Sequence, residues 1–360
     1  MSTVQPTGVS QLLFLRLREN RWSKLLERVM RETPPGGVLL SEPLPRTAEE
    51  TQAFTSKIRR ACTRPVFIAI RQDGGDCDPL SRYFPGLPSP RAVAKKSPDA
   101  VGRWADLIGE ALARLGFNTN FAPTLDLASH SSAKDLGRRT FGRNPHQVTE
   151  CGRAFVRGLA RHKILSCGKH FPGRGSVPCE QTAGLRVSAK PMAVLWSEDL
   201  LPFRRLLPRL PMVLISSAAY KAYDFDIPRS ASLSSSIVQG LLREKLEYRG
   251  LTLAHDLESS HVHGTLGFDH AVIQSVESGC DLIIVDHGAP FGSALRALAT
   301  GTQSGRLPAP RVAEALRRIR STARRIPPMP PRIAMRAVEN LQNRFENFSS
   351  EFAGEESDHA

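Results

Sequence analysis

Eight short apolar runs, each followed by a segment with helical spacing, constrain the fold of this chain most strongly. Runs rich in Val, Ile and Leu are typical of parallel strands that are covered on both faces. The expected strands are Gln11–Leu17, Gly37–Leu40, Pro65–Ile70, Phe117–Ala122, Ile164–Gly168, Met212–Ser216, Leu251–Ala254 and Asp281–Val285. The expected helices are Arg21–Arg31, Ala48–Ala61, Asp99–Leu115, Pro145–His162, Val194–Leu207, Ser235–Leu246 and Ala271–Ser278. This alternation predicts a (β/α)₈ TIM-type barrel, and no G-x-G-x-x-G turn follows the first strand to favour a doubly wound sheet.

The end of the chain differs in composition from the barrel segment. A proline-rich stretch, Ile326-Pro-Pro-Met-Pro-Pro-Arg332, breaks any helix. We therefore expect a barrel domain over residues 1–326 and a linker with a C-terminal helix (Ile333–Phe348) over 327–350. An acidic, disordered tail is expected over 351–360.

Composition and charge exclude several classes of protein. Six scattered cysteines without a C-x-x-C pair favour reduced thiols over a disulfide framework or a zinc site. The N-terminal residues lack a signal-peptide pattern, and no apolar run approaches the roughly 18–20 residues that span a bilayer. We therefore expect a cytoplasmic protein with no membrane contact. The net charge is +14, but the arginines are spread along helices, so nucleic-acid binding is not expected.

Polar side chains gather where several expected strands end, which is the end of a TIM barrel that carries chemistry. Lys169 and His170 leave one strand and can donate hydrogen bonds to sugar hydroxyls. The following glycine-rich turn lacks the spacing of a phosphate-binding loop, and a plain structural turn stays an alternative. Asp126 and Asp286 end two other strands, and we expect them to support the floor of a pocket.

Four motifs and one strand occur in an order that resembles a known family. They are Ile70–Asp76 (IRQDGGD), Asn120–Asp126 (NFAPTLD), Arg139–Pro145 (RTFGRNP), Lys169–Gly173 (KHFPG) and Asp281–Ile284 (DLII). The set resembles the barrel domain of glycoside hydrolase family 3, nearest to the single-domain bacterial β-N-acetylhexosaminidases that trim cell-wall fragments. The resemblance implies a cytoplasmic barrel that removes terminal N-acetylglucosamine with retention of configuration and needs no metal or other cofactor.

Both main catalytic positions depart from the pattern of that family. Retaining hydrolysis usually needs a nucleophile and a proton donor on either side of the glycosidic bond. The resemblance places the nucleophile, an Asp in the family, at His255. It places the proton-donor loop, D-x-H in the family, at Glu180 and Thr182. We therefore expect family-type hydrolysis to be lost.

The positions that contact the sugar are partly retained. The expected ligand-binding residues are Lys169, His170, Arg139, Arg71, Asp73 and Arg174. Of these, Lys169, His170 and Arg139 match the family. Arg71 replaces an acidic residue, Asp76 replaces an Arg, and Arg174 and Ser217 replace His. Charges around the pocket are therefore altered.

Two functional hypotheses remain. The first is a catalytically degenerate barrel that binds an amino sugar or a muropeptide-like fragment, and a protein partner stays open. The second is an active hydrolase in which Asp256 serves as an alternative nucleophile and Glu180 as the acid. Neighbouring side chains on a strand point to opposite faces, so Asp256 is expected to face the helix layer unless a bulge intervenes. The histidines His255, His261 and His263 are not expected to converge on a metal ion.

Overall fold

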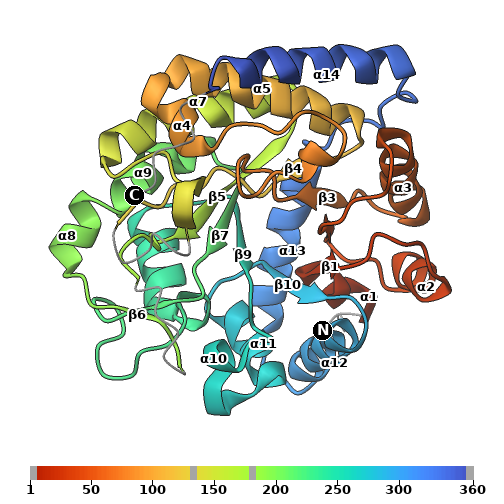
Figure 1. Ribbon diagram of the computed structural model, residues 1–360. Helices are drawn as coiled ribbons and strands as arrows, with labels where there is room; N and C mark the ends of the chain where they lie inside the picture. The colour runs from red at the N-terminus through yellow and green to blue at the C-terminus, as the bar shows by residue number, and fades with distance from the viewer. Residues whose placement is uncertain (1–5, 130–135, 178–183, 354–360) are drawn as a thin grey trace.

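The computed structural model describes residues 6–129, 136–177 and 184–353. Eight parallel strands form a closed barrel in the order β1-β10-β9-β7-β5-β4-β3-β2 (Figure 1). The barrel strands are β1 (Leu13–Leu17), β2 (Gly37–Leu40), β3 (Phe67–Ile70), β4 (Thr119–Asn120), β5 (Leu165–Phe171), β7 (Met212–Ile215), β9 (Leu251–Ala254) and β10 (Leu282–Asp286). A separate two-stranded sheet pairs β6 (Val187–Ser188) with β8 (Ala219–Tyr220). The predicted (β/α)₈ barrel is confirmed.

Helices surround this barrel. The α-helices are α1 (Pro6–Val9), α2 (Lys24–Glu32), α3 (Ala48–Ala61), α4 (Pro90–Lys96), α5 (Pro98–Arg114), α7 (Pro145–Arg161), α8 (Met192–Ser197), α9 (Leu200–Leu206), α10 (Ser260–His263), α11 (Phe268–Glu277), α12 (Ala289–Gln303), α13 (Ala309–Ala323) and α14 (Met335–Ser350). The other helical segments are η1 (Ser10–Leu12), η2 (Pro79–Arg82), η3 (Gly137–Arg139), η4 (Leu207–Arg209), η5 (Ala231–Leu233), η6 (Ser236–Lys245) and η7 (Gly264–Leu266).

Local sequence explains where several helices begin. The Ser97 hydroxyl accepts a hydrogen bond from the Ala100 backbone N–H (3.1 Å), and the Ser234 hydroxyl accepts one from Ile237 (3.2 Å). Such caps satisfy first-turn donors that have no partner inside the helix. The segment expected as one helix, Val194–Leu207, is instead divided into α8 and α9. Its backbone leaves the helical region at Glu198 (φ −110°, ψ −84°).

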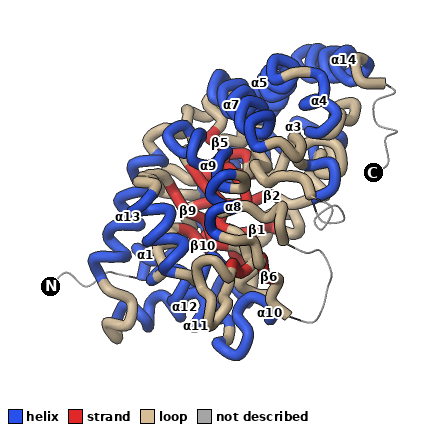
Figure 2. The backbone as a smooth tube through the Cα atoms, turned by 90° about the vertical axis from the view of Figure 1, so that its left-hand side faces the viewer, coloured by secondary structure: helices blue, strands red, loops and turns tan. Residues whose placement is uncertain are grey.

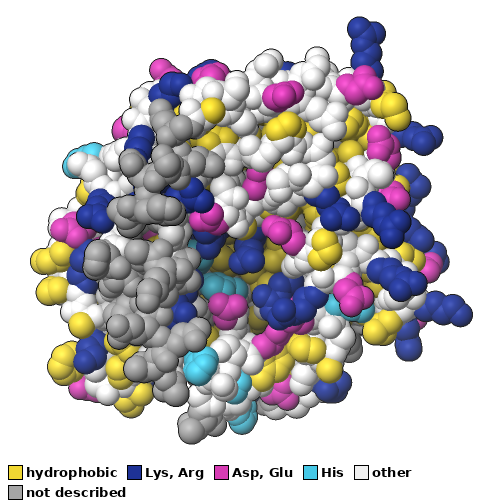
Figure 3. Space-filling model, in the orientation of Figure 1, with side chains coloured by type: hydrophobic (Ala, Val, Ile, Leu, Met, Phe, Trp, Pro, Cys, Tyr) yellow, Lys and Arg dark blue, Asp and Glu magenta, His cyan; other side chains and the backbone are white. Residues whose placement is uncertain are grey.

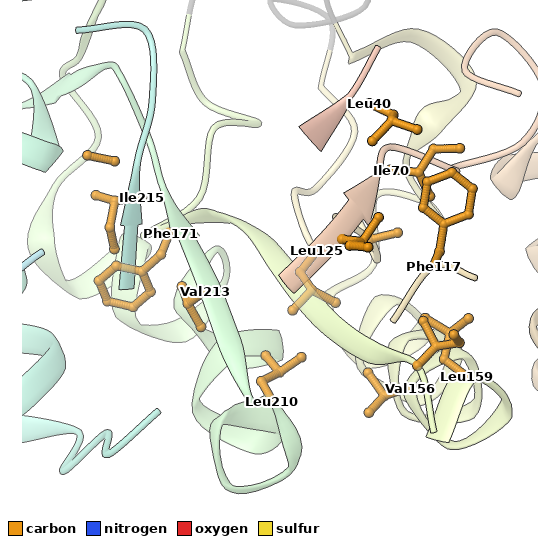
Figure 4. Close-up of a cluster of buried hydrophobic side chains, with 14 of the residues drawn as sticks. Leu40, Ile70, Phe117, Leu125, Val156, Leu159, Phe171, Leu210, Val213 and Ile215 are labelled. Carbon is orange, nitrogen blue, oxygen red and sulfur yellow. The ribbon is translucent and has the colours of Figure 1, made fainter. Parts of the chain in front are cut away.

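Two apolar layers stabilise the barrel. The outer layer lies between strands and helices, and Figure 4 shows Val213 and Ile215 of β7 in this cluster with Val156 and Leu159 of α7. The inner layer fills the barrel and includes Phe14, whose neighbours Leu13 and Leu15 belong to the outer layer. This alternation follows from the two-residue period of a strand.

Helix α13 closes the N-terminal end of the barrel. Its Ile319 and Ala323 belong to the inner apolar layer together with strand residues such as Phe67 and Leu282. Figure 2 shows α13 running along one side of the strands, away from α8 and β6. Because this end is filled, the C-terminal end of the barrel is left to form a pocket.

The C-terminal helix α14 packs on α5 along the outside of the barrel (Figure 1). The Phe345 ring stacks on Phe84 with centroids 4.7 Å apart. Beyond this helix, Phe352 is buried and Glu351 pairs with Arg103 at 2.8 Å. Glu351 and Phe352, which were expected to begin a disordered tail, therefore contact other parts of the folded chain, whereas Ala353 is exposed.

The other predictions about the chain's organisation are not tested. Residues 354–360 lie outside the described part, and the division into barrel, linker and tail otherwise stays a prediction. Within the described residues, none of the helices combines the length and the hydropathy that a membrane span requires. The described cysteines Cys62, Cys77, Cys151, Cys167 and Cys280 are free thiols.

Candidate functional site

A pocket of about 670 Å³ opens at the C-terminal end of the barrel. Figure 3 looks onto this face and shows Lys, Arg, His and acidic side chains gathered around a hollow. Its described cationic lining residues are Arg16, Arg18, Arg71, Arg139, Lys169 and Arg174. Its described acidic lining residues are Glu42, Asp76 and Asp256. His170 and His255 also line the pocket.

Lys169 and Arg139 share one buried carboxylate. The Lys169 ammonium donates to both oxygens of Asp73 (2.9 and 2.8 Å) and to the Phe121 carbonyl (2.6 Å). The Arg139 guanidinium donates to Asp73 Oδ2 from Nε (3.1 Å) and Nη2 (2.8 Å). Burial alone would raise the pKa of Asp73, but the two cations outweigh it and lower the pKa to about 2. Asp73 therefore stays ionised and fixes both cations.

Asp73, which the sequence placed among the ligand-binding residues, lies behind the pocket lining. It is 2% exposed and does not line the pocket, because Lys169 and Arg139 occupy both of its oxygens. Its role is to position Lys169 and Arg139, whose side chains do line the pocket.

His170 is held by Asp126 in one orientation. Its Nδ1–H donates to Asp126 Oδ2 (2.7 Å), and the Asp126 Oδ1 accepts from the backbone N–H groups of His170 (3.2 Å) and Arg174 (2.7 Å). Burial lowers the pKa of His170 to about 4, with Asp126 opposing the shift. The imidazole is therefore neutral at pH 7. Asp126 has the supporting role that we expected.

Consecutive residues of β5 reach the same pocket because the strand is irregular. The pairing of β5 with β7 shifts register between Lys169 and Phe171. A regular strand would alternate faces, so an irregularity of this kind lets both Lys169 and His170 line the pocket while Phe171 joins the outer apolar layer.

His255 and Asp256 both line the pocket, and the expected orientation of Asp256 is wrong. Strand β9 ends at Ala254, and Asp256 has a positive φ of 59°, so the alternation of a strand no longer applies. The two side chains pair, with His255 Nδ1 and Asp256 Oδ2 2.8 Å apart. The His255 imidazole lowers the pKa of Asp256, whereas burial opposes this. Asp256 is therefore an ionised carboxylate at the pocket wall.

The second nitrogen of His255 is buried and has no hydrogen-bond partner within the described residues. The His255 ring lies beside His170, with centroids 5.8 Å apart. Because Nδ1 donates to a carboxylate, a neutral His255 carries its lone pair on Nε2. Two carboxylate-bound imidazoles therefore stand next to each other in the pocket.

The sequence-based reasoning missed two arginines of the pocket. Arg16 and Arg18 come from β1 and its end, and both bind Asp286 at the end of β10. Arg18 donates from Nε at 2.6 Å, and Arg16 also approaches Glu258 at 3.5 Å. The two arginines are spaced i, i+2 at the end of the first strand, and this spacing could have predicted that both side chains face the pocket. Asp286 supports the pocket floor as expected.

Of the remaining predicted site residues, two line the pocket and two lie outside the part of the chain that the structure describes. Arg71 and Arg174 line the pocket. Glu180 and Thr182 lie outside the described residues, so the proton-donor loop stays a prediction. Across the described ranges, no group of three or more His, Cys, Asp and Glu side chains is arranged to hold a metal ion.

An eight-stranded barrel with a polar pocket at the C-terminal ends of its strands is the arrangement of TIM-barrel enzymes. The model of the glycosyl hydrolase family 3 N-terminal domain matches residues 8–322, so the chain belongs to this family. The resemblance stated from the motifs is thereby confirmed.

Within this family, the chain is similar to bacterial beta-hexosaminidases. A beta-hexosaminidase of Alkalilimnicola ehrlichii is 30% identical over 272 residues, which are 73% of this chain and 77% of that protein. One of Nitrosomonas eutropha is 28% identical over 258 residues, or 69% and 73% of the two chains. The solved glycoside hydrolase family 3 beta-N-acetylglucosaminidase from Paenibacillus sp. str. FPU-7 has a TM-score of 0.86 at 24% identity and covers 97% of this chain and 69% of that chain. At that identity the last comparison supports the fold alone.

Proposed function

We propose that this family 3 barrel binds an amino sugar, or a cell-wall fragment that contains one, and has lost the hydrolytic activity of its family. The observation that carries the proposal is that one pocket keeps the cations expected to bind the sugar but lacks the carboxylate expected to attack it. Lys169 and Arg139 are held rigidly on Asp73, while the position that the resemblance assigns to the nucleophile carries the imidazole of His255.

The chemistry of the reaction supports this proposal. Glycoside cleavage passes through an oxocarbenium-like transition state, which a carboxylate stabilises by charge and by forming a covalent intermediate. A neutral imidazole offers no negative charge, and a protonated one repels the developing positive charge. Binding by Lys169, Arg139 and His170 does not depend on that carboxylate.

One observation favours the second candidate, an active hydrolase with displaced carboxylates. Asp256 lines the pocket and is ionised, with its half-exposed carboxylate beside His255. In this alternative, Asp256 is the nucleophile and Glu180 the acid. The two candidates differ in whether removal of the Asp256 charge abolishes turnover.

The test combines a hydrolysis assay with a binding assay. The protein is expected to release no p-nitrophenol from p-nitrophenyl N-acetyl-β-glucosaminide above the rate of the His255→Ala variant, and Asp256→Asn should change nothing. N-Acetylglucosamine should bind in calorimetry, more weakly to Arg139→Gln but unchanged to Arg209→Gln, an exposed arginine at the opposite end of the barrel. Turnover that Asp256→Asn abolishes would favour the second candidate, and no binding to the unaltered protein would contradict the first.

We further propose that the protein binds fragments released during cell-wall recycling, and that it does so in the cytoplasm. Support for this role comes from the family resemblance and from the beta-hexosaminidase relatives. Cell fractionation with an antibody against the protein tests the location.

A further inference from the structure

We infer that the sugar bound in this pocket carries an anionic group, a carboxylate or a phosphate, that pairs with Arg71. The inference rests on the proposed function, because it specifies the ligand of the same pocket. Arg71 follows the last residue of β3 and lines the pocket with Lys169 and Arg139.

The cations of the pocket differ in how their charge is balanced. Lys169 and Arg139 share Asp73, and Arg16 and Arg18 share Asp286. Within the described part of the chain, the exposed Arg71 side chain makes neither a hydrogen bond nor an ion pair. Its five donors are therefore available to a ligand.

The acidic residues of the pocket lining do not pair with Arg71 in the described part of the chain. Asp76 pairs with Arg138 at 2.9 Å, and Asp256 pairs with His255 at 2.8 Å. Glu42 is the third acid among the described lining residues, and within the described part of the chain it makes no ion pair with Arg71. A neutral sugar therefore leaves the positive charge of Arg71 without a partner.

The chemistry of arginine and the size of the pocket indicate which anion fits. The planar guanidinium binds carboxylate and phosphate groups through two parallel hydrogen bonds. A cavity of about 670 Å³ is in the range that encloses a small molecule rather than a polymer surface. A single sugar residue with one acidic substituent meets both conditions, since Lys169 and Arg139 can hold its hydroxyls while Arg71 holds its charge.

The experiment compares three probes by calorimetry on the full chain: N-acetylglucosamine, N-acetylglucosamine 6-phosphate and N-acetylmuramic acid. We expect at least one anionic sugar to bind about tenfold or more tightly than the neutral one, a difference of roughly 1.4 kcal/mol. Arg71→Gln should reduce the difference to less than about threefold, because it weakens binding of the anionic sugar more than binding of the neutral one. Arg71→Glu should make the anionic sugar the weaker ligand. Comparing the affinities for N-acetylglucosamine 6-phosphate and N-acetylmuramic acid shows whether the pocket prefers a phosphate or a carboxylate.

The controls separate failure of this inference from failure of the proposed function. Arg209→Gln removes one exposed positive charge far from the pocket and should leave all three affinities unchanged. Equal binding of neutral and anionic sugars, or a preference that survives Arg71→Gln, overturns the inference and leaves amino-sugar binding intact. Inorganic phosphate that binds as tightly as the sugar phosphate also overturns it. If none of the three sugars binds, both the inference and the proposed function are wrong.

Discussion

At the scale of single residues, Asp73 determines whether the pocket can hold its cations. Its carboxylate is buried and accepts hydrogen bonds from Lys169 and Arg139. Removing one partner of a buried ion pair leaves the other charge without compensation, which costs more than the pair contributes. Retention of both cations in the pocket therefore depends on this one acid.

Asp73→Asn is expected to lower the free energy of unfolding by about 3–5 kcal/mol, because Lys169 then remains buried without a counterion. Urea denaturation measures the change. Asp76→Asn is the matched control, since the Arg138 partner is 40% exposed and the pair is worth about 1 kcal/mol or less. Equal losses in the two variants would contradict the structural role of Asp73.

The buried His170 makes stability depend on pH in a defined window. Its pKa is lowered from 6.5 to about 4 by burial, so between these values the unfolded chain binds a proton that the folded chain does not. Stability is therefore expected to fall as the pH falls from 6.5 to 4, by about 1 kcal/mol per pH unit from this group. We expect urea unfolding of His170→Gln to show a flatter dependence in this window than the unaltered protein.

His261→Gln provides the comparison for that titration. His261 is exposed on α10, so its replacement should leave the pH slope unchanged. A His170→Gln variant with the slope of the unaltered protein would show that another group titrates.

At the scale of elements, α14 stabilises the barrel from outside through a few aromatic contacts. Phe345 is fully buried and stacks on Phe84. Phe345→Ala is expected to cost about 3–5 kcal/mol of unfolding free energy, because it removes buried surface and leaves a cavity. Met335→Ala, at a side chain 72% exposed on the same helix, should change stability by less than about 0.5 kcal/mol. A loss of that small size in Phe345→Ala would mean that the helix does not depend on this contact.

The elements that the sequence predicted best are those whose pattern is purely local. The bounds of β2, β9 and α3 match the prediction because continuous apolar runs or one capped amphipathic helix define them. β4 is reduced to Thr119–Asn120, because the Phe117 backbone N–H donates to Leu112 at the end of α5 instead of to a strand, although the Phe121 N–H still donates to Ile70 of β3 (2.8 Å).

The site was less predictable than the fold. The pocket residues Lys169, His170, Arg71 and Arg174 were predicted from motifs at strand ends, and Arg139 was predicted from a motif of the family resemblance. The orientation of Asp256 was wrong because a residue with positive φ follows the strand, and nothing in the sequence around an Asp specifies that conformation. The sharing of Asp73 by two cations depends on residues 66 and 96 positions away, which only the folded barrel brings together.

At the scale of the whole molecule, hydrolysis would need groups from two loops that the barrel assembles. His255 follows β9, while the expected proton-donor loop with Glu180 and Thr182 follows β5. Restoring one group leaves the other step of the reaction without its catalyst, and effects of residues that act as a unit are not additive.

His255→Asp alone is therefore not expected to hydrolyse an alkyl N-acetyl-β-glucosaminide faster than the unaltered protein. The added carboxylate could attack the anomeric carbon, but Thr182 cannot donate a proton to the leaving group at neutral pH. An alkyl glycoside is the substrate of this assay because its leaving group needs a proton, whereas the p-nitrophenolate group departs without one. His261→Asp, at an exposed position outside the pocket lining, controls for the added charge. Substantial turnover of the alkyl glycoside by His255→Asp would show that an acid such as Glu180 already stands in place, and the barrel would then be one substitution from an active hydrolase.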